Sequence, residues 1–339
     1  MANGKGPRIA VIGGGTGTFT VLTSLKDYAQ DITAVVNMVD DGGSTGVLRD
    51  ELGVLPAGDV RQSLVALSNE SEELRELFNY RFPKGSFAGG HSFGNLFISA
   101  LEKVTGSMSE AVRVAGDVLA IRGKVIPATT ENIRLMLETS DGRIIRGEDK
   151  IGEGPANDPL FVKGEFHRMW LEPHAKLNPE AKKALLTADL IVIAPGKLYS
   201  SILPSLLLEG MGETLRNAKG KKIYVCNLMT RPNQTAGFTV QDFASEVERY
   251  AGGPFLDYVI YNTARPTKQL LDKYALEGER EPVEFDTAGL RDQHYAAIGE
   301  PLISRTAVKR NPNDTMLSRT LIRHDSDKIA RLIMRIYFS

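Results

Sequence analysis

The sequence is almost free of cysteine, because Cys226 is the only one among 339 residues. An intrachain disulfide is therefore impossible, and a cysteine-rich zinc site is excluded. A chain so poor in cysteine is typical of the reducing cytosol, so we expect a cytoplasmic location. The sequence also lacks an apolar run of the roughly 18 residues that a membrane span needs, and it lacks the apolar core of a signal peptide.

Neither sign of charge is in excess. The 41 basic and 42 acidic residues leave a formal net charge of −1. Binding to nucleic acid through the overall field needs a basic surplus, so we expect no nucleic-acid partner. Hydrophobic residues make up 42% of the chain, which is enough for a globular core.

Short apolar runs alternate with helical stretches along the whole chain. Runs at Ile9–Ile12 and Ile32–Val39 enclose a helical stretch at Phe19–Tyr28, which is the pattern of a βαβ unit. The alternation continues to a closing helix at Ser326–Ile336, with Asp325 and Ser326 as candidate caps. We predict one α/β domain over residues 1–339, with a doubly wound, mainly parallel sheet.

Two stretches interrupt this alternation. A small β-containing insertion is predicted near residues 120–175, with strands at Thr130–Leu137 and Ile144–Ile151 and a further candidate strand at Arg168–Glu172. Residues 278–315 lack a clear period and are predicted to form an irregular lobe near the C-terminus.

A glycine-rich loop follows the first apolar run. Glycine lets the backbone approach a ligand closely, and the free N–H groups at a helix start, with the helix dipole, favour an anion. The loop therefore predicts a phosphate site, with threonine hydroxyls as further donors, and the alternative is a tight turn alone. Its residues are Gly13, Gly14, Gly15, Thr16, Gly17 and Thr18.

This loop lacks features of two common nucleotide-binding motifs. The third glycine of the dinucleotide fingerprint is missing, because Thr18 or Thr20 stands in its place. We therefore do not expect NAD as a cofactor. No Walker lysine follows the loop, which disfavours a P-loop NTPase.

A second polar loop begins with the adjacent carboxylates Asp40 and Asp41. Ligands bind at the carboxyl ends of strands in such sheets, so these residues are candidate catalytic groups. They are also candidate ligands for Mg²⁺, which prefers oxygen. One of them could instead accept a proton or bind a sugar hydroxyl, and the alternative to function is a helix cap and turn.

Residues near this loop add candidate ligand contacts. Asn37, Ser44 and Thr45 belong to the same segment, and Arg49 has a guanidinium group that matches phosphate oxygens, as does Arg61. Asp59 is either the N-cap of a helix that starts near Val60 or a catalytic group.

A third polar loop, Gly89–Asn95, opens another helix. Ser92 and Asn95 are candidate donors to a phosphate or a base. His91 is a candidate for acid–base chemistry or for lining the pocket, and the alternative is a structural histidine.

Taken in order, these segments resemble the bacterial YvcK/CofD-like family. The resemblance spans nearly the whole chain and rests on Gly13–Thr18, Val36–Gly46, Gly58–Arg61, Gly90–Leu96, Ile121–Gly123, Ile126–Thr129, Pro195–Gly196, Cys226–Thr230 and Arg323–Asp325. It implies a Rossmann-like fold shared with 2-phospho-L-lactate transferase, which transfers a phospholactyl group to a deazaflavin with Mg²⁺.

The YvcK branch is associated instead with UDP-sugars such as UDP-N-acetylglucosamine, with cell shape and with gluconeogenic growth. The resemblance then implies that the glycine loop, Gly196 and Arg323 hold a diphosphate, and that Asn227 or Asn262 reads the sugar or base. Binding of this kind requires no cofactor. A homo-oligomer stays open, as does a CofD-type transferase reaction.

Two departures from the family pattern concern the second half of the pocket. Lys197 stands where the family often has serine after the Pro-Gly pair, and it is a candidate diphosphate contact. Asn233-Gln234-Thr235 stands where the family often has Gly-Glu-Thr, so a glutamate contact to sugar or metal is missing.

Overall fold

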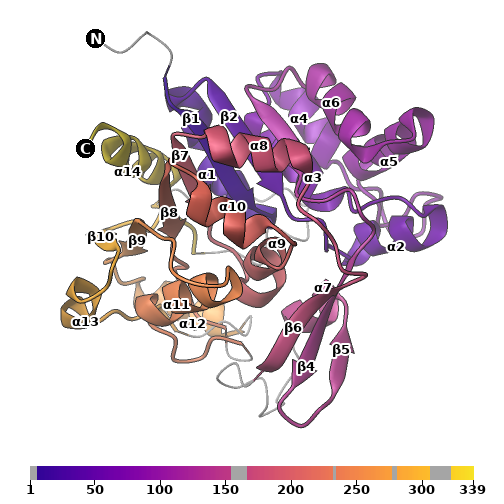
Figure 1. Cartoon of the computed structure of the whole chain (residues 1–339). Coiled ribbons are helices and arrows are strands. Elements are labelled where there is room, and N and C mark those ends of the chain that lie inside the picture. Colours follow the sequence, from indigo (N-terminus) through magenta and orange to yellow (C-terminus); the bar gives the residue numbers. More distant parts are fainter. Residues whose placement is uncertain (1–5, 154–165, 232–233, 277–280, 306–321) are drawn as a thin grey trace.

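A seven-stranded sheet runs through the middle of the molecule (Figure 1). The computed structural model describes residues 6–153, 166–231, 234–276, 281–305 and 322–339. All neighbouring strands of this sheet pair in parallel. In spatial order the strands are β3 (Lys124–Pro127), β2 (Asp31–Val36), β1 (Arg8–Gly13), β7 (Leu190–Ile193), β8 (Lys221–Val225), β9 (Tyr258–Asn262) and β10 (Ala296–Glu300).

The central strands are buried on both faces, as their near-continuous apolar runs predict. Along β1, Ile9 and Val11 point into one core, whereas Ala10 and Ile12 point into the other. Helices cover both faces, which confirms the predicted doubly wound α/β fold. In the described residues the helices outside the small sheet and α7 are α1 (Gly15–Tyr28), α2 (Gly43–Leu52), α3 (Gly58–Leu67), α4 (Glu72–Asn79), α5 (Phe93–Thr105), α6 (Met108–Val118), α8 (Pro179–Thr187), α9 (Leu203–Leu206), α10 (Met211–Asn217), α11 (Val240–Tyr250), α12 (Lys268–Leu276), α13 (Thr287–Arg291) and α14 (Ser326–Phe338), besides the π-helical turn after β7.

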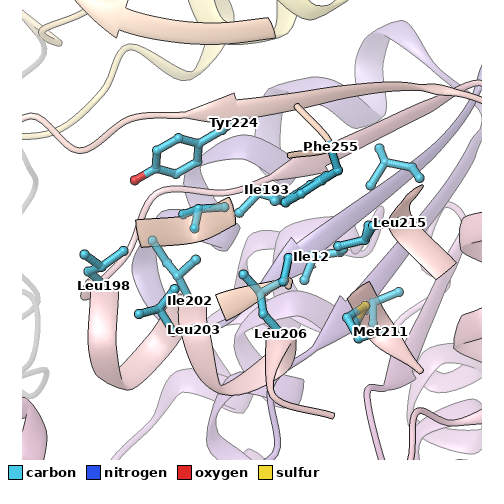
Figure 2. Close-up of a cluster of buried hydrophobic side chains, with 14 of the residues drawn as sticks. Ile12, Ile193, Leu198, Ile202, Leu203, Leu206, Met211, Leu215, Tyr224 and Phe255 are labelled. Carbon is cyan, nitrogen blue, oxygen red and sulfur yellow. The ribbon is translucent and has the colours of Figure 1, made fainter. Parts of the chain in front are cut away.

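One of the two cores lies between the sheet and the segment that follows β7 (Figure 2). Ile12 and Ile193, from neighbouring strands, pack against Leu203 and Leu206 of α9 and against Ile202 of the π-helical turn η1 (Leu198–Ile202). This packing fixes the segment that carries Pro195–Lys197, and so it fixes one wall of the site described below.

The strand order reverses direction between β1 and β7. From β1 the chain moves to β2 and β3 on one side, and it later returns through β7 to build the other side. Loops that leave such neighbouring strands diverge, and ligands bind in the crevice between them. The crevice here lies between the glycine loop after β1 and the loop after β7.

The predicted insertion is smaller than residues 120–175, because β3 belongs to the main sheet. The antiparallel three-stranded sheet consists of β5 (Ile144–Arg146), β4 (Arg134–Thr139) and β6 (Phe166–Glu172). The predicted strand Ile144–Ile151 ends at Arg146, and residues Glu148–Glu153 form the helix α7 instead. The backbone N–H of Asp149 donates to the Asp41 carboxylate at 2.8 Å, a long-range contact that stabilises the start of this helix.

Within the range 278–315, the described residues 281–305 are more regular than predicted. They contain α13, which Asp286 caps, and β10, which pairs with β9 at the edge of the main sheet. Of the two candidate caps of α14, Asp325 is confirmed, since its carboxylate accepts from the N–H of Lys328. Within the ranges described, no helix is both long and apolar enough to cross a bilayer.

Candidate functional site

A cavity of about 930 Å³ opens where the loops after β1 and β7 diverge. Its walls come from the start of α1, the loops after β2, β7 and β8, the start of α3, the loop at residues 81–91, α7, and residues 322–324. Many residues that the sequence singled out lie in these walls. They are Gly14, Gly15, Thr16, Gly17, Asn37, Asp40, Ser44, Thr45, His91, Asn95, Gly196, Lys197, Asn227 and Arg323.

The glycine loop approaches the loop after β7 more closely than any side chain would allow. A Cβ atom on Gly17 would overlap the carbonyl oxygen of Pro195. Gly15 has φ +64°, a conformation that residues with a side chain rarely adopt. The N-cap of α1 is Gly14, which offers no side-chain acceptor to the first N–H groups of the helix. These donors therefore face the cavity or its lining groups.

Six residues from the sequence-based candidates are placed elsewhere than in the cavity wall. Gly13 ends β1, Thr18 is buried and donates to the carbonyl oxygen of Gly14, and Ser92 caps α5 by accepting from the N–H of Asn95. Asn262 binds the backbone of Ala264 and accepts from the N–H of Leu302. These four positions shape the loops, and their polar groups are satisfied by the protein itself.

Arg49 and Asp41 are the other two. The Arg49 guanidinium is buried and donates to the side chain of Asn132 and to the carbonyl oxygen of Ile133. Asp41 forms an ion pair with Arg134 at 3.5 Å and accepts from the N–H of Asp149. Both residues tie the loop after β2 and α2 to the small sheet, which the sequence did not indicate.

Three of the carboxyl groups in the cavity wall are buried and lie close enough to interact through their charges: Asp40, Asp59 and Glu148. Burial raises the pKa of all three. The neighbouring charges of Asp40 and Glu148 raise the pKa of Asp59 further, to well above its usual value. The pKa of Glu148 reaches about 7, because burial outweighs the nearby Lys197 ammonium, whose Nζ is 3.8 Å from Oε1.

Asp59 was predicted as a helix cap or a catalytic group, and the structure contradicts the cap. Helix α3 begins at Gly58 after Ala57, which forms no side-chain cap. The Asp59 carboxylate instead accepts a hydrogen bond from the backbone N–H of Gly15. It therefore occupies a donor of the glycine loop.

Cationic side chains surround the same cavity. Three of them, Arg61, Lys197 and Arg323, were noted in the sequence as phosphate contacts, and the other three were not. The set in the described residues is Arg61, Arg81, Lys84, Lys197, Arg231 and Arg323. A cavity that carries both cations and carboxyl groups fits a ligand with phosphates and hydroxyl groups.

The amide of Asn227 and the imidazole of His324 hold the backbone of the wall formed by the loops after β7 and β8. The Asn227 side chain donates to the carbonyl oxygen of Gly196 at 2.6 Å, so it joins the loops after β7 and β8. His324 Nε2 is 3.1 Å from the carbonyl oxygen of Cys226, and burial lowers the pKa of this imidazole to about 4. His324 is therefore a neutral donor to that carbonyl at neutral pH.

Sequence reasoning missed several cavity residues. Glu148 and Asp149 lie more than a hundred positions after Asp40, in an insertion whose helix was predicted as a strand. Arg81 and Lys84 belong to a loop without any motif. The one signal that pointed toward them was the neighbouring Gly89–Asn95 segment, because its glycines mark a backbone turn at the ligand.

The expectation of Mg²⁺ concerns the carboxyl groups of the cavity. Across the described ranges, no group of three or more His, Cys, Asp or Glu side chains has an arrangement that could hold a metal ion. Mg²⁺, however, usually keeps its waters and binds one or two carboxylates together with substrate phosphates. Asp40 and Asp59 fit that mode, whereas Asp41 does not, because it faces Arg134 and α7.

The chain is similar to proteins of one family over nearly its whole length. The profile of the family described as 2-phospho-L-lactate transferase CofD matches residues 9–303. The gluconeogenesis factor of Bacillus subtilis is 39% identical over 332 residues, which cover 98% of each chain. The gluconeogenesis factor of Listeria innocua is 37% identical over 336 residues, covering 98% of this chain and 97% of that one. A crystal structure of a UPF0052 family member from Bacillus halodurans superposes with a TM-score of 0.86 and 34% identity, covering 97% of this chain and 99% of that one.

Proposed function

The chain belongs to the CofD family, and from that premise we propose that it binds a nucleotide sugar of the UDP-N-acetylglucosamine type. In this proposal it is a binding factor that supports gluconeogenic growth and cell shape. The names of its relatives in Bacillus subtilis and Listeria innocua support the link to gluconeogenesis.

One observation carries the proposal: the cavity lies at the point where the strand order reverses, between the uncapped start of α1 and the loop after β7. Backbone N–H groups at such a helix start favour a diphosphate. Lys197, on the opposite loop, adds a positive charge that can bind a phosphate oxygen.

The remaining walls suit the rest of such a ligand. The Arg323 side chain and the loop after β8 lie in the wall that also contains His324. The carboxyl groups of Asp40 and Asp59 lie near the glycine loop, where they can accept hydrogen bonds from sugar hydroxyls. Because the Asp59 carboxylate already holds the N–H of Gly15, a bound diphosphate must displace it or share that donor.

Isothermal titration with UDP-N-acetylglucosamine tests the proposal. We expect saturable binding that Arg323→Ala weakens by about 1.5–3 kcal/mol, the value of a charge-assisted hydrogen bond. Arg331→Ala is the matched control, because Arg331 lies on α14, is exposed and pairs with Asp327 outside the cavity. Absence of binding by any UDP-sugar, or equal losses in the two variants, would contradict the proposal.

The cellular role needs its own test. A strain that lacks this protein should grow poorly and change shape on gluconeogenic carbon sources, and the wild-type gene should restore both. A gene carrying Arg323→Ala should restore neither if ligand binding is required, whereas one carrying Arg331→Ala should restore both. If the Arg323→Ala gene restores growth and shape fully at an equal protein level, ligand binding in the cavity is not required for the cellular role.

A second candidate function is a CofD-type phospholactyl transfer to a deazaflavin hydroxyl. The specific observation in its favour is the carboxyl group pair Asp40 and Asp59 beside the glycine loop. When bound there, Mg²⁺ would neutralise phosphate charge. Asp40 and Asp59 would hold the ion, and the glycine loop would orient the phosphates. Product formation from a nucleotide-linked donor and the deazaflavin, lost in Asp40→Asn, would favour this function, and no product under any divalent metal would remove it.

A further inference from the structure

A chain of hydrogen bonds connects buried Arg61 to His91 in the cavity wall. It passes through Asn95, at the start of α5, and Ser44, at the start of α2. The direction of these hydrogen bonds can be assigned, because a guanidinium group can only donate, whereas the amide, hydroxyl and imidazole groups can both donate and accept.

Arg61 sets the direction at its end of the chain. A guanidinium group only donates, so the atom of Asn95 that lies 2.9 Å from Arg61 Nε must be the amide oxygen. The backbone of Asn95 is held as well, since its N–H donates to Ser92 Oγ. The amide NH₂ group is therefore turned toward Ser44 and Thr45, with contacts of 3.4 Å to each hydroxyl oxygen.

Both hydroxyl groups then accept from Asn95 and are left to donate onward. Thr45 donates to the carboxylate of Asp40. Ser44 Oγ lies 3.0 Å from His91 Nδ1. A serine oxygen can accept two hydrogen bonds, so the amide alone does not place the serine proton. Among the contacts of Ser44 Oγ in the described residues, however, only Nδ1 can accept this proton, and Nδ1 is then unprotonated.

We propose that this chain fixes His91 as the neutral tautomer with its proton on Nε2, and that this Nε2–H donates to a phosphoryl oxygen of the ligand. The proposal deepens the proposed function and rests on it for the identity of the ligand. A phosphoryl oxygen fits because His91 lines the cavity beside the start of α2, whose N-cap, Gly42, provides no side-chain acceptor to the helix. Asn95 and Ser44 are positioning residues, since they act on the ligand through His91.

Nitrogen-15 NMR of the histidine rings tests the tautomer without any ligand. The protein has five histidines, and His91→Gln identifies the His91 signals by their loss. We expect a pyridine-type Nδ1 and a protonated Nε2 at neutral pH. A proton on Nδ1, or on both nitrogens, would overturn the proposal.

Asn95→Asp should reverse the chain. An aspartate keeps an acceptor for Arg61 but cannot donate to Ser44, so Ser44 would donate to the aspartate and accept from His91. The protonated nitrogen should then change from Nε2 to Nδ1, and affinity for UDP should fall at least about tenfold. Asn79→Asp is the matched control, because Asn79 also accepts from Arg61 but does not contact Ser44. An unchanged tautomer in Asn95→Asp, or the same change in both variants, would overturn the proposal.

Ser44→Ala keeps the proposal testable if Asn95→Asp does not fold. It removes the hydrogen-bond donor to Nδ1, so the single tautomer should become a mixture of two. Addition of UDP to the wild-type protein should shift the Nε2 signal of His91. UDP binding that leaves this signal unmoved would overturn the contact between His91 and the ligand. Failure of any nucleotide to bind would count against both the proposed function and this contact. The tautomer measured without ligand would still decide the direction of the hydrogen bonds.

Discussion

The carboxylate of Asp41 accepts a hydrogen bond from the backbone N–H of Asp149 at 2.8 Å, and it thereby joins the loop after β2 to the first turn of α7. The same carboxylate pairs with Arg134 of β4 at 3.5 Å. Asp41 therefore holds the small sheet and α7 against the main domain, and it fixes the helix that brings Glu148 into the cavity.

Replacement of Asp41 should loosen this attachment. Asp41→Ala removes the acceptor for the Asp149 N–H and the partner of Arg134, so we expect a loss of about 1.5–3 kcal/mol in unfolding free energy. Chemical denaturation monitored by the fluorescence of Trp170, on β6, reports on this region. Asp50→Ala is the control, because Asp50 pairs with the same arginine from an exposed position, and such pairs contribute about 0–1 kcal/mol. Equal losses in both variants would show that Asp41 has no special role.

Glu148 should make stability depend on pH. Its pKa in the folded protein is about 7, above the ordinary glutamate value of 4.5, because it is buried. The folded state therefore holds this proton more tightly than the unfolded state. The protonated Glu148 side chain contributes fully to the free energy of unfolding below pH 4.5, and this contribution is lost as the pH rises toward 7. Glu148→Gln should remove this loss and raise Tm at pH 8 by about 2–5 °C.

The same variant should change Tm little at pH 4, where Glu148 is protonated in both states. Glu138→Gln is a suitable control, since Glu138 lies on β4 of the neighbouring small sheet and pairs with Arg168 outside the cavity. A Tm gain in Glu148→Gln that is the same at pH 4 and pH 8 would contradict the role of the buried carboxylate.

Gly17 should not tolerate a side chain. Gly17→Ala would place a methyl group onto the carbonyl oxygen of Pro195, so the two loops must separate, at a cost of about 1–3 kcal/mol. Binding of UDP-N-acetylglucosamine should weaken as well, because the loops form opposite walls of the cavity. Gly53→Ala is the control: Gly53 has a positive φ of 62° but open space around it, so only stability should fall, by about 1 kcal/mol. Normal binding by Gly17→Ala would contradict the assigned place of the ligand.

The sequence predicted the central sheet well, because its signals are local. The apolar runs at Ile9–Ile12 and Ile32–Val39 and the glycines after the first run specify strands and a turn without help from the rest of the chain. The family resemblance also predicted the fold correctly, because it rests on short motifs such as Gly13–Thr18 that follow directly after strands. Residues that follow directly after strands, such as Gly15, Asp40 and Lys197, could also be predicted to meet in one cavity.

The errors came from contacts that connect distant parts of the chain. The predicted strand extended from Ile144 to the apolar residue Ile151. In the structure a helix begins at Glu148 instead, and the Asp41 carboxylate stabilises its first turn. Asp59 has the residue type of a cap, yet the chain at Gly58 already turns into the helix and frees its carboxylate for Gly15. Arg49 has the right group for a phosphate, but its guanidinium donates to Asn132 and Ile133 instead.

A crystal structure with UDP-N-acetylglucosamine tests the central claim most directly. We expect the diphosphate within hydrogen-bonding distance of the backbone N–H groups of Gly14–Gly17, with Lys197 on its other side and the Asp59 carboxylate moved off the N–H of Gly15. A diphosphate bound outside this cavity, or a hydrogen bond between Asp59 and the N–H of Gly15 that persists at saturating ligand, would contradict the claim.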